Sequence, residues 1–531
     1  MTRAPVEPMG RSLSEIAAEV FETLAERFPV ACASDEFYYF PQAVAESGRW
    51  DRWDRLTPET VAETAGRLSA WETALAGWEQ AVDDLDDRVD AATLRRHCRA
   101  LREQLTEFRA WARQPSFILT LAAVGLAEAL ESDDPTAAHR RAGTLADFLN
   151  QSRRHLIDAP AVFLAAGREM VPAVRRYLVG LLDRLPELSP AIAALDRFDG
   201  RLRDLSPSGD GIGPTAGFER ILAVHLGTGL SVAEADDLLR AEIAETVGIL
   251  ESEAGRAAPG ASDWRAAMET IPRPSVGPGG LVALYREAVA DLEAHCRAVG
   301  LVSPETAAAC PVRVAPVPDY LSAVRTASAY AIPPGHPPVG GTFYVIGADD
   351  PAEAARGYHR EYRILTAHET YPGHHLLDVS RWANPRPLRR PLERPLFYEG
   401  WACFAESMIA ETGFLDGPAD RMLLARRRLW RAVRGRVDLG LNAGTMTPAE
   451  AVEALVETGT DPDAAAAAVR KYPLNPGYQV CYTIGLRRFA RLFRRYGDND
   501  PAGFARTVLR EGEIGFDLMT AVLRRAASRK G

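Results

Sequence analysis

Lysine is nearly absent from this chain of 531 residues, because it occurs only at Lys471 and Lys530 and arginine supplies every other basic side chain. Basic residues number 62 and acidic residues 72, which gives a formal net charge of -10. A net negative chain repels a polyanion, so we expect no nucleic-acid partner. The scarcity of lysine fits GC-rich coding better than it fits a binding role.

Paired cysteines and long apolar runs are missing as well. The six cysteines show no Cys-x-x-Cys spacing, and a chain of this length with 47% hydrophobic residues needs no disulfides to hold a core. No stretch reaches the roughly 18 uninterrupted apolar residues of a membrane-spanning helix. Residues 1–14 contain no apolar run of the signal-peptide kind. We therefore expect a soluble, cytoplasmic protein with no membrane partner.

Three of the ten histidines gather in one short segment with a glutamate: His368, Glu369, His374 and His375. In zinc hydrolases of the His-Glu-x-x-His kind, two imidazoles one helical turn apart bind the metal, and the glutamate beside the first acts as general base. In this chain Pro372 stands where the second histidine would be. The strict motif is therefore broken, and the second ligand has to come from His374 or His375.

Helix geometry alone selects neither histidine. On a straight helix His374 would lie about 240° round from His368, whereas His375 would return to within roughly 20° but lie about 10 Å further along the axis. A Pro-Gly pair, however, can kink or bulge a helix. A bulge that absorbs two residues makes His374 the second ligand, and it leaves His375 to bond the substrate or to support a ligand from behind.

The third ligand is expected from a second helix, 25 residues after His374, where Glu399 and Glu406 share one face among apolar neighbours. A carboxylate in such surroundings is costly unless a cation or hydrogen bonds receive it. We interpret Glu399 as the zinc ligand and Glu406 as the residue that orients a ligand histidine. The alternative is that one or both face solvent.

Three motifs of the C-terminal half resemble one bacterial family. His-Glu-Thr-Tyr-Pro-Gly-His-His-Leu begins at His368, Tyr-Glu-Gly-Trp-Ala at Tyr398, and Asn-Pro-Gly-Tyr-Gln-Val-Cys-Tyr-Thr-Ile-Gly at Asn475. Their order and spacing resemble the family known as domain of unknown function 885 (DUF885). That family is in turn similar to helical zinc peptidases of the thimet oligopeptidase and neurolysin type. The resemblance implies a large, mainly α-helical, metallopeptidase-like fold with a deep central cleft, and it favours His374 and Glu399 as ligands.

The third motif adds candidates for contact with the substrate. Helical zinc peptidases usually bring a late-sequence tyrosine to the oxyanion, and the resemblance gives that role to Tyr482. A tyrosine in a helix is otherwise most often a core residue. Tyr478 stands where the family more usually has glutamine, and we count it among the residues that contact the substrate or support the ligands. Arg487 could receive a substrate carboxylate, with a solvated arginine as the alternative.

Helical signals dominate the chain. Capping boxes begin at Ser12, Ser231 and Thr447, each before an amphipathic run. The clearest strand covers residues 341–346, just upstream of the histidine segment. Such a strand could pair at its edge with an extended peptide, or it could form a simple structural hairpin.

A break rich in serine, proline and glycine separates residues 1–210, expected to form one wall of the cleft, from residues 211–531, expected to hold the metal. These features predict a zinc metallohydrolase with one Zn²⁺ per chain. Glu369 would activate water, and the substrates would be short peptides or amino-acid amides. Two alternatives stay open: a dedicated amidase acting on an amino-acid conjugate in a biosynthetic pathway, and an inactive binding protein stabilised by its metal.

Overall fold

The structure, a computed structural model of the whole chain, describes residues 11–44, 49–209, 215–277, 279–322, 328–348, 357–497 and 500–528. The expected boundary at residues 210 and 211 lies outside these ranges, and so do residues 1–10 of the N-terminal stretch. Within the described ranges, the elements are helices and one small sheet of short strands. This arrangement confirms the expected mainly α-helical fold with a small β element.

The chain divides into two compact units. Unit 1 consists of Met1–Gly213, Pro318–Thr326 and Pro385–Glu393, and unit 2 consists of Pro214–Val317, Ala327–Asn384 and Arg394–Gly531. A single cut near residue 210 therefore misses two later segments that belong to unit 1. The role of the N-terminal region as a cleft wall stays a prediction.

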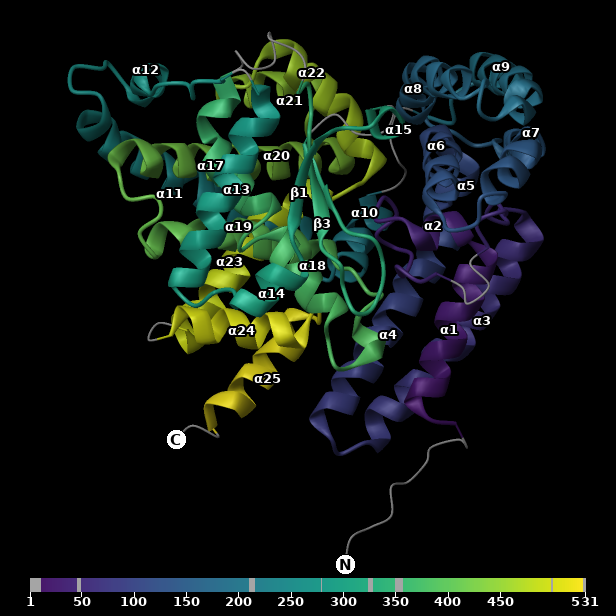
Figure 1. Cartoon of the computed structure of the whole chain (residues 1–531), viewed down its shortest axis with the longest axis horizontal. Coiled ribbons are helices and arrows are strands. Elements are labelled where there is room, and N and C mark those ends of the chain that lie inside the picture. The colour runs from purple at the N-terminus through teal and green to yellow at the C-terminus, as the bar shows by residue number, and fades with distance from the viewer. Residues whose placement is uncertain are drawn as a thin grey trace, which may run out of the picture. The chain divides into compact units, whose positions relative to one another are not determined.

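Unit 1 is built from helices alone in its described part (Figure 1). They are α1 (Leu13–Arg27), α2 (Pro29–Ala33), α3 (Pro58–Ala81), α4 (Leu85–Glu103), η2 (Gln104–Phe108), α5 (Ala110–Arg113), α6 (Pro115–Glu131), α7 (Ala137–His155), α8 (Ala161–Gly180), η3 (Pro186–Leu188), α9 (Ser189–Asp204), α15 (Asp319–Ser322) and η6 (Pro387–Arg389). Of these, α6 is buried on nearly every turn, because it is apolar on all sides.

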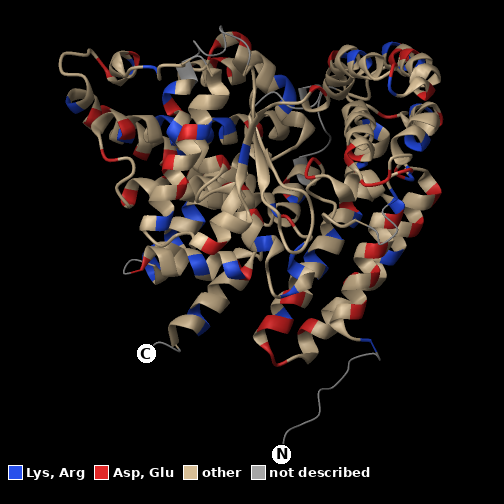
Figure 2. Ribbon diagram, in the orientation of Figure 1, with Lys and Arg blue, Asp and Glu red and all other residues tan. Residues whose placement is uncertain are grey.

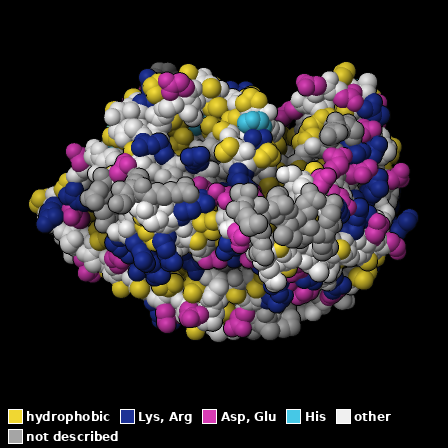
Figure 3. Space-filling view, turned by 90° about the horizontal axis from the view of Figure 1, so that it is seen from below, with side chains coloured by type: hydrophobic (Ala, Val, Ile, Leu, Met, Phe, Trp, Pro, Cys, Tyr) yellow, Lys and Arg dark blue, Asp and Glu magenta, His cyan; other side chains and the backbone are white. Residues whose placement is uncertain are grey.

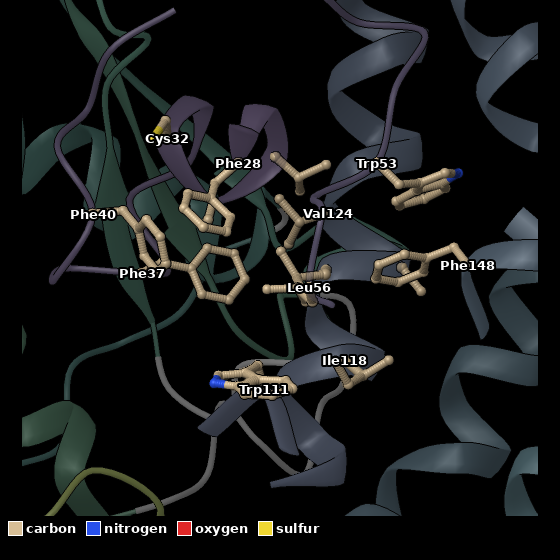
Figure 4. Close-up of a cluster of buried hydrophobic side chains, with 14 of the residues drawn as sticks. Phe28, Cys32, Phe37, Phe40, Trp53, Leu56, Trp111, Ile118, Val124 and Phe148 are labelled. Atoms are coloured by element: carbon tan, nitrogen blue, oxygen red, sulfur yellow. The ribbon is translucent and has the colours of Figure 1, made fainter. Parts of the chain in front are cut away.

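Aromatic side chains fill the core of unit 1 beside α6 (Figure 4). Phe28 and Phe40 meet edge to face with ring centroids 5.2 Å apart, and Trp53 stacks on Phe148 at 4.9 Å. Such aromatic pairs add roughly 0.5–1.5 kcal/mol each beyond the area they bury. The core of unit 1 therefore does not depend on the candidate metal residues, all of which belong to unit 2.

Unit 2 contains the candidate site (Figure 1). Its helices are α10 (Thr215–Arg220), η4 (Ile221–His225), α11 (Val232–Ala257), α12 (Trp264–Thr270), α13 (Gly280–Ala298), α14 (Pro304–Ala309), η5 (Gly357–Glu361), α17 (Tyr362–Glu369), α18 (His374–Trp382), α19 (Pro395–Glu411), α20 (Pro418–Ala443), α21 (Pro448–Val456), α22 (Pro462–Lys471), η7 (Tyr472–Leu474), α23 (Tyr478–Tyr496), α24 (Pro501–Glu511) and α25 (Phe516–Ser528). In its body, α11 packs on α20, α20 on α23, and α23 on α19.

The sheet of unit 2 has three strands in the order β1-β3-β2. They are β1 (Val312–Pro316), β2 (Ala329–Ala331) and β3 (Gly341–Val345). The predicted strand is β3, which is confirmed to within one residue. It pairs in parallel with β1 and antiparallel with β2, so both of its edges are occupied. Of the two alternatives for this strand, the structure therefore contains the hairpin, formed with β2, and leaves β3 no free edge for a peptide.

Three helices begin at the predicted capping boxes, which are therefore confirmed. These are α1 at Ser12, α11 at Ser231 and α21 at Thr447. In each, the cap hydroxyl accepts a hydrogen bond from the backbone N–H three residues on. The glutamate at that position accepts one from the backbone of the cap in return.

Charged residues of both signs are interspersed along the helices of both units (Figure 2). On the face seen from below, basic, acidic and apolar side chains are likewise mixed (Figure 3). Among the helices that the structure describes, none combines the length and the apolar content that crossing a lipid bilayer requires.

Candidate metal centre

The histidine segment is split between two helices. α17 ends at Glu369 and α18 begins at His374, with the Pro-Gly pair in the turn between them. The chain therefore breaks the expected helix instead of bulging it, because Pro372 has no N–H to continue the ladder. Gly373 closes the turn by donating its N–H to the carbonyl of Ala367 at 3.1 Å. The break returns His374 to the side of His368, and the two rings lie 4.6 Å apart at 80°.

Two contacts fix this turn. A Cβ atom on Gly373 would lie 2.0 Å from the carbonyl oxygen of His368, so that no other residue fits there without a shift of the backbone. On the other side, the indole N–H of Trp401 from α19 donates to the carbonyl of Pro372 at 2.9 Å. The same helix carries Glu399, so the turn and the third candidate ligand are joined directly.

His368, His374 and Glu399 meet at one point, and all three are buried. The Glu399 Oε2 atom lies 3.4 Å from Nε2 of His368 and 3.5 Å from Nε2 of His374. Ligand atoms of a tetrahedral zinc site with bonds of about 2.0–2.1 Å lie about 3.3 Å apart. Glu399 therefore has the spacing of a zinc ligand from both histidines, and the three ligand atoms lie within 4.8 Å of one another.

Glu399 shows how a cation would fit. Its Oε1 accepts a hydrogen bond from the phenol of Tyr478 at 2.6 Å, whereas its buried Oε2 has no hydrogen-bond partner in the described part of the chain. Burial raises the pKa of Glu399, but the imidazoles of His368 and His374 outweigh it and hold that pKa well below its usual range. An ionised, buried oxygen without a donor is costly, and a metal ion at the triad would satisfy it.

Glu406 lies behind His368, as the sequence indicates. Its Oε1 is 3.0 Å from Nδ1 of His368, and both of its oxygens accept from Arg431 of α20, at 2.6 and 2.7 Å. Arg431 also lies 3.2 Å from the same Nδ1. A guanidinium can only donate and a carboxylate can only accept, so Nδ1 donates to Glu406 in the tautomer that carries its proton there, which is the tautomer a metal bound at Nε2 requires. The lone pair of His368 is then on Nε2, where it faces Glu399.

The second histidine is held by stacking. The ring of His374 lies 3.9 Å from that of Tyr398 with an angle of 16° between the planes. Its Nδ1 is buried and has no hydrogen-bond partner among the described residues. The orientation of His374 thus comes from α18 and from the aromatic face of Tyr398, without a supporting carboxylate.

Glu369 points toward the sheet. Its Oε2 accepts a hydrogen bond from the backbone N–H of Tyr330 at 3.0 Å, and Tyr330 lies on β2, the strand at one edge of the sheet. Burial raises the pKa of Glu369 to about 7, with the Glu399 carboxylate acting in the same direction and His374 opposing it. The side chain is 7% exposed, beside the two candidate histidine ligands.

His375 turns away from the triad. It is fully buried between two phenols, with Nδ1 at 2.8 Å from the hydroxyl of Tyr330 and Nε2 at 3.1 Å from that of Tyr371. Burial lowers the pKa of His375 to about 3, so the ring is neutral. It is therefore not placed to bond a substrate, and it fixes β2 to α18 through Tyr330.

The remaining two candidates differ in their surroundings. The ring of Tyr482 on α23 lies 6.3 Å from that of His368, nearly parallel to it, and burial raises the pKa of its phenol, with the Glu399 carboxylate acting in the same direction. Arg487, one turn further on the same helix, is engaged elsewhere. Its NH1 pairs with Glu242 at 2.6 Å and with Glu245 at 3.3 Å. Two acids of α11 therefore already hold Arg487, and its contact with a substrate carboxylate stays a prediction.

Sequence reasoning missed three residues at this site: Tyr330, Arg431 and Arg434. Arg431 and Arg434 lie three residues apart on α20, in a helix with many arginines and no motif of its own. Tyr330 is far upstream on a strand of only three residues. The one available signal was the buried pair of acids Glu399 and Glu406, which called for a cationic partner that the sequence does not locate.

Fold and site together define a mainly helical protein with a buried His-His-Glu cluster of metal-binding geometry. The model of the family described as "Bacterial protein of unknown function (DUF885)" matches residues 184–523. The chain belongs to this family. A search of curated proteins finds no match.

Two solved structures resemble the whole chain in fold. A protein of Shewanella oneidensis, described as a "putative lipoprotein of unknown function", is 15% identical, has a TM-score of 0.72, and aligns over 98% of this chain and 100% of its own. A protein of Colwellia psychrerythraea, described as a "putative lipoprotein", is 17% identical, has a TM-score of 0.80, and aligns over 97% of this chain and 99% of its own. At these identities the likeness concerns the fold alone.

Proposed function

We propose that the protein is a zinc-dependent hydrolase that cleaves amide bonds of short peptides. One observation carries the proposal: a buried carboxylate oxygen of Glu399 lies 3.4 and 3.5 Å from the Nε2 atoms of His368 and His374, and the three ligand atoms lie within 4.8 Å of one another. A glutamate follows the first histidine directly. The parallel with helical zinc peptidases rests on this site and on the motifs, and zinc remains part of the proposal.

The chain's own residues would divide the work. Bound zinc would supply a Lewis acid that polarises the scissile carbonyl and makes a water easier to deprotonate. Glu369 would take the proton of the attacking water and pass it to the leaving amine. The hydroxyl of Tyr482 would donate a hydrogen bond to the oxygen that becomes negative in the transition state. Tyr478 and Glu406 would hold Glu399 and His368 in position.

Short substrates are favoured by burial. The side chains of His368, His374 and Glu399 are each 6% exposed. Tyr398, Tyr478 and Tyr482, which lie beside them, are half-buried. A folded protein would not reach so deep a position, whereas a slender chain end would. A cytoplasmic location remains part of the proposal, and it agrees with six buried cysteines that form no disulfide.

The test combines metal analysis with hydrolysis. We expect about one zinc per chain by elemental analysis, and cleavage of members of a peptide library by mass spectrometry. Glu369→Gln should keep the zinc and the melting temperature while lowering hydrolysis by at least about 100-fold, because the amide keeps the shape of the side chain but accepts no proton. Full activity in this variant would exclude the mechanism, whatever the metal content.

The same experiment separates the alternatives. Zinc without cleavage of any library member, but with cleavage of acylated amino acids, would indicate a dedicated amidase. Zinc without any hydrolysis would indicate a metal-stabilised binding protein. The two solved structures of similar fold are described as putative lipoproteins. Cells that produce this protein should therefore also be fractionated, and the protein located in the soluble or the membrane fraction. Recovery in the membrane fraction would overturn the cytoplasmic location and leave the chemistry untouched.

A further inference from the structure

Arg427, Arg431 and Arg434 of α20 lie near the metal centre, and of these three only Arg434 has no acidic partner among the residues that the structure describes. Arg427 pairs with Glu361 at 3.2 Å, and Arg431 pairs with Glu406 at 2.6 Å. Arg434 forms no ion pair with any residue that the structure describes; its terminal nitrogen donates to the amide oxygen of Gln479. One positive charge beside the centre is therefore not neutralised by contact.

The surroundings of Arg434 hold its guanidinium but leave it short of acceptors. The guanidinium carbon lies 4.2 Å from the ring centroid of Trp430 and 4.9 Å from that of Tyr482. Its Nε is buried without a hydrogen-bond partner among the described residues. Arg434 is half-buried, and so are Trp430 and Tyr482, so part of this group of side chains is open to solvent. An arginine stacked in this way is fixed in direction.

The nearest acid on the same helix does not compensate. Asp438 follows Arg434 by one turn, and its carboxylate receives the backbone N–H groups of Gly477 and Gln479 at 3.0 and 2.9 Å and the amide of Asn442 at 2.6 Å. Those bonds use its oxygens to start α23. Asp438 therefore anchors the helix that carries Tyr478 and Tyr482, and Arg434 keeps donors to spare.

Arg434 lies within reach of a substrate bound at the metal centre. Tyr482 links the two, because its ring is 4.9 Å from the guanidinium carbon and 6.3 Å from the ring of His368. An extended peptide spans about 3.3–3.6 Å per residue, so at most about three residues separate the scissile bond from this arginine.

We propose that Arg434 binds the free α-carboxylate of the substrate, so that the enzyme acts near the carboxyl end of short peptides or on acylated amino acids. This inference rests on the proposed hydrolase function. A guanidinium matches a carboxylate with two parallel N–H···O bonds, and partial burial strengthens the pairing. Arg487, which the sequence alone offers for contact with a substrate carboxylate, pairs with Glu242 and Glu245.

The test measures binding and needs no turnover. Zinc-loaded protein carrying Glu369→Gln would be titrated by calorimetry with acetyl-Ala-Ala-Ala as the free acid and as its C-terminal amide. We expect the acid to bind at least about tenfold more tightly, the size of a charge-assisted contact. With Arg434→Gln added, the acid should bind no more tightly than the amide, and the affinity for the amide should be unchanged. Arg434→Lys should restore part of the preference for the acid, because it returns the charge without the planar fork.

Arg436→Gln is the matched control. Arg436 lies two residues further on α20 and pairs with Asp236 at 2.7 Å, so its loss should leave the acid-to-amide ratio unchanged. Equal binding of acid and amide before any change at Arg434, or a ratio that survives both Arg434→Gln and Arg434→Lys, would overturn the inference. If Arg434→Gln does not fold, Arg434→Lys alone tests the inference, because it should bind the acid with a smaller preference over the amide than wild-type Arg434 gives.

Two further readouts separate this inference from the proposed function. Hydrolysis of library peptides without preference for a free carboxyl end would refute the role of Arg434 and leave the hydrolase intact. If the protein binds the acid more tightly than the amide but cleaves no peptide, the role of Arg434 stands and the hydrolase function is refuted. Acetyl-alanine as a third probe distinguishes the sources of the carboxylate: binding as tight as that of the tripeptide points to acylated amino acids, and weaker binding points to peptides. Either result keeps the assignment.

Discussion

Gly400 of α19 and Gly485 of α23 lie back to back, and a Cβ atom on Gly400 would fall 2.5 Å from the Cα atom of Gly485. The two helices can approach this closely only because neither glycine has a side chain. Glu399 precedes Gly400 in the chain, and Tyr482 lies one turn before Gly485. The close approach therefore brings a candidate ligand beside the phenols of α23.

Replacement of either glycine by alanine should disturb both the packing and the metal centre. For Gly400→Ala we expect a loss of about 1–3 kcal/mol in unfolding free energy from overpacking, more if the helices cannot separate, together with reduced zinc content. Gly248→Ala in α11 is the control, because nothing lies within 4 Å of its would-be Cβ, and it should be neutral or slightly stabilising. Denaturant unfolding measures the unfolding free energy of the two variants, and elemental analysis measures their zinc content. Wild-type zinc in Gly400→Ala would show that this contact does not position Glu399.

Much of the candidate site could be predicted from the sequence, because its residues stand in local motifs. His368, His374, Glu399 and Glu406 were selected by spacing, by the cost of burying acids and by the family resemblance, and the structure brings all four together. The manner in which His374 returns was less predictable. A Pro-Gly pair permits a bulge, a kink or a break, and the choice depends on contacts such as that of Trp401, which lies on another helix.

Residues outside motifs could not be predicted. One arginine of α20 or α23 resembles another in the sequence, and only the packing of these helices against α11 and α19 decides which meets an acid. Arg487 pairs with α11 and Arg431 with α19 for that reason. The strand of residues 341–346 was predictable as a strand from its composition, but its central place in the sheet was not, because β1 and β2 are short and carry weak signals.

Replacing either of the two adjacent histidines by alanine should affect zinc binding and stability in opposite ways. His374→Ala should lose zinc, because it removes one of three ligands. His375→Ala should keep zinc and lower the unfolding free energy by about 2–5 kcal/mol, because it leaves a cavity and the two buried phenols of Tyr330 and Tyr371 unpaired. Zinc content and chemical denaturation of the metal-loaded variants give both numbers. Zinc lost from His375→Ala and retained in His374→Ala would reverse the ligand assignment.

The two tyrosines of α23 should separate metal binding from chemistry. Tyr478→Phe removes the donor to Oε1 of Glu399 and should weaken zinc affinity by about 10–100-fold, as the loss of a group that supports a ligand usually does. Tyr482→Phe should keep most of the zinc and lower kcat by about 10–100-fold, less than Glu369→Gln, because one oxyanion donor is lost. Competition with a chelator measures the affinity, and initial rates with saturating zinc measure kcat. Equal zinc affinities in both variants would exclude the distinct role of Tyr478.

The buried carboxyl of Asp438 should make stability depend on pH in a direction opposite to that of an ordinary ion-paired acid. Burial raises the pKa of Asp438 from 3.8 to about 7, against the hydrogen bonds from Gly477, Gln479 and Asn442 that lower it. Between these two values the folded chain holds a proton that the unfolded chain has released, so this group contributes its stability at low pH and loses it as the pH rises toward 7.

Asp438→Asn should remove that dependence, because an amide has the shape of the protonated acid but does not titrate. The variant loses one acceptor of a backbone N–H, which costs about 1–3 kcal/mol at every pH. The difference in unfolding free energy between wild type and variant should therefore be largest near pH 5 and should shrink toward pH 8, by at most about 1.4 kcal/mol per pH unit. Urea unfolding at fixed ionic strength over this range measures it. A difference that stays constant from pH 5 to pH 8 would mean that Asp438 is ionised throughout, held by its three donors.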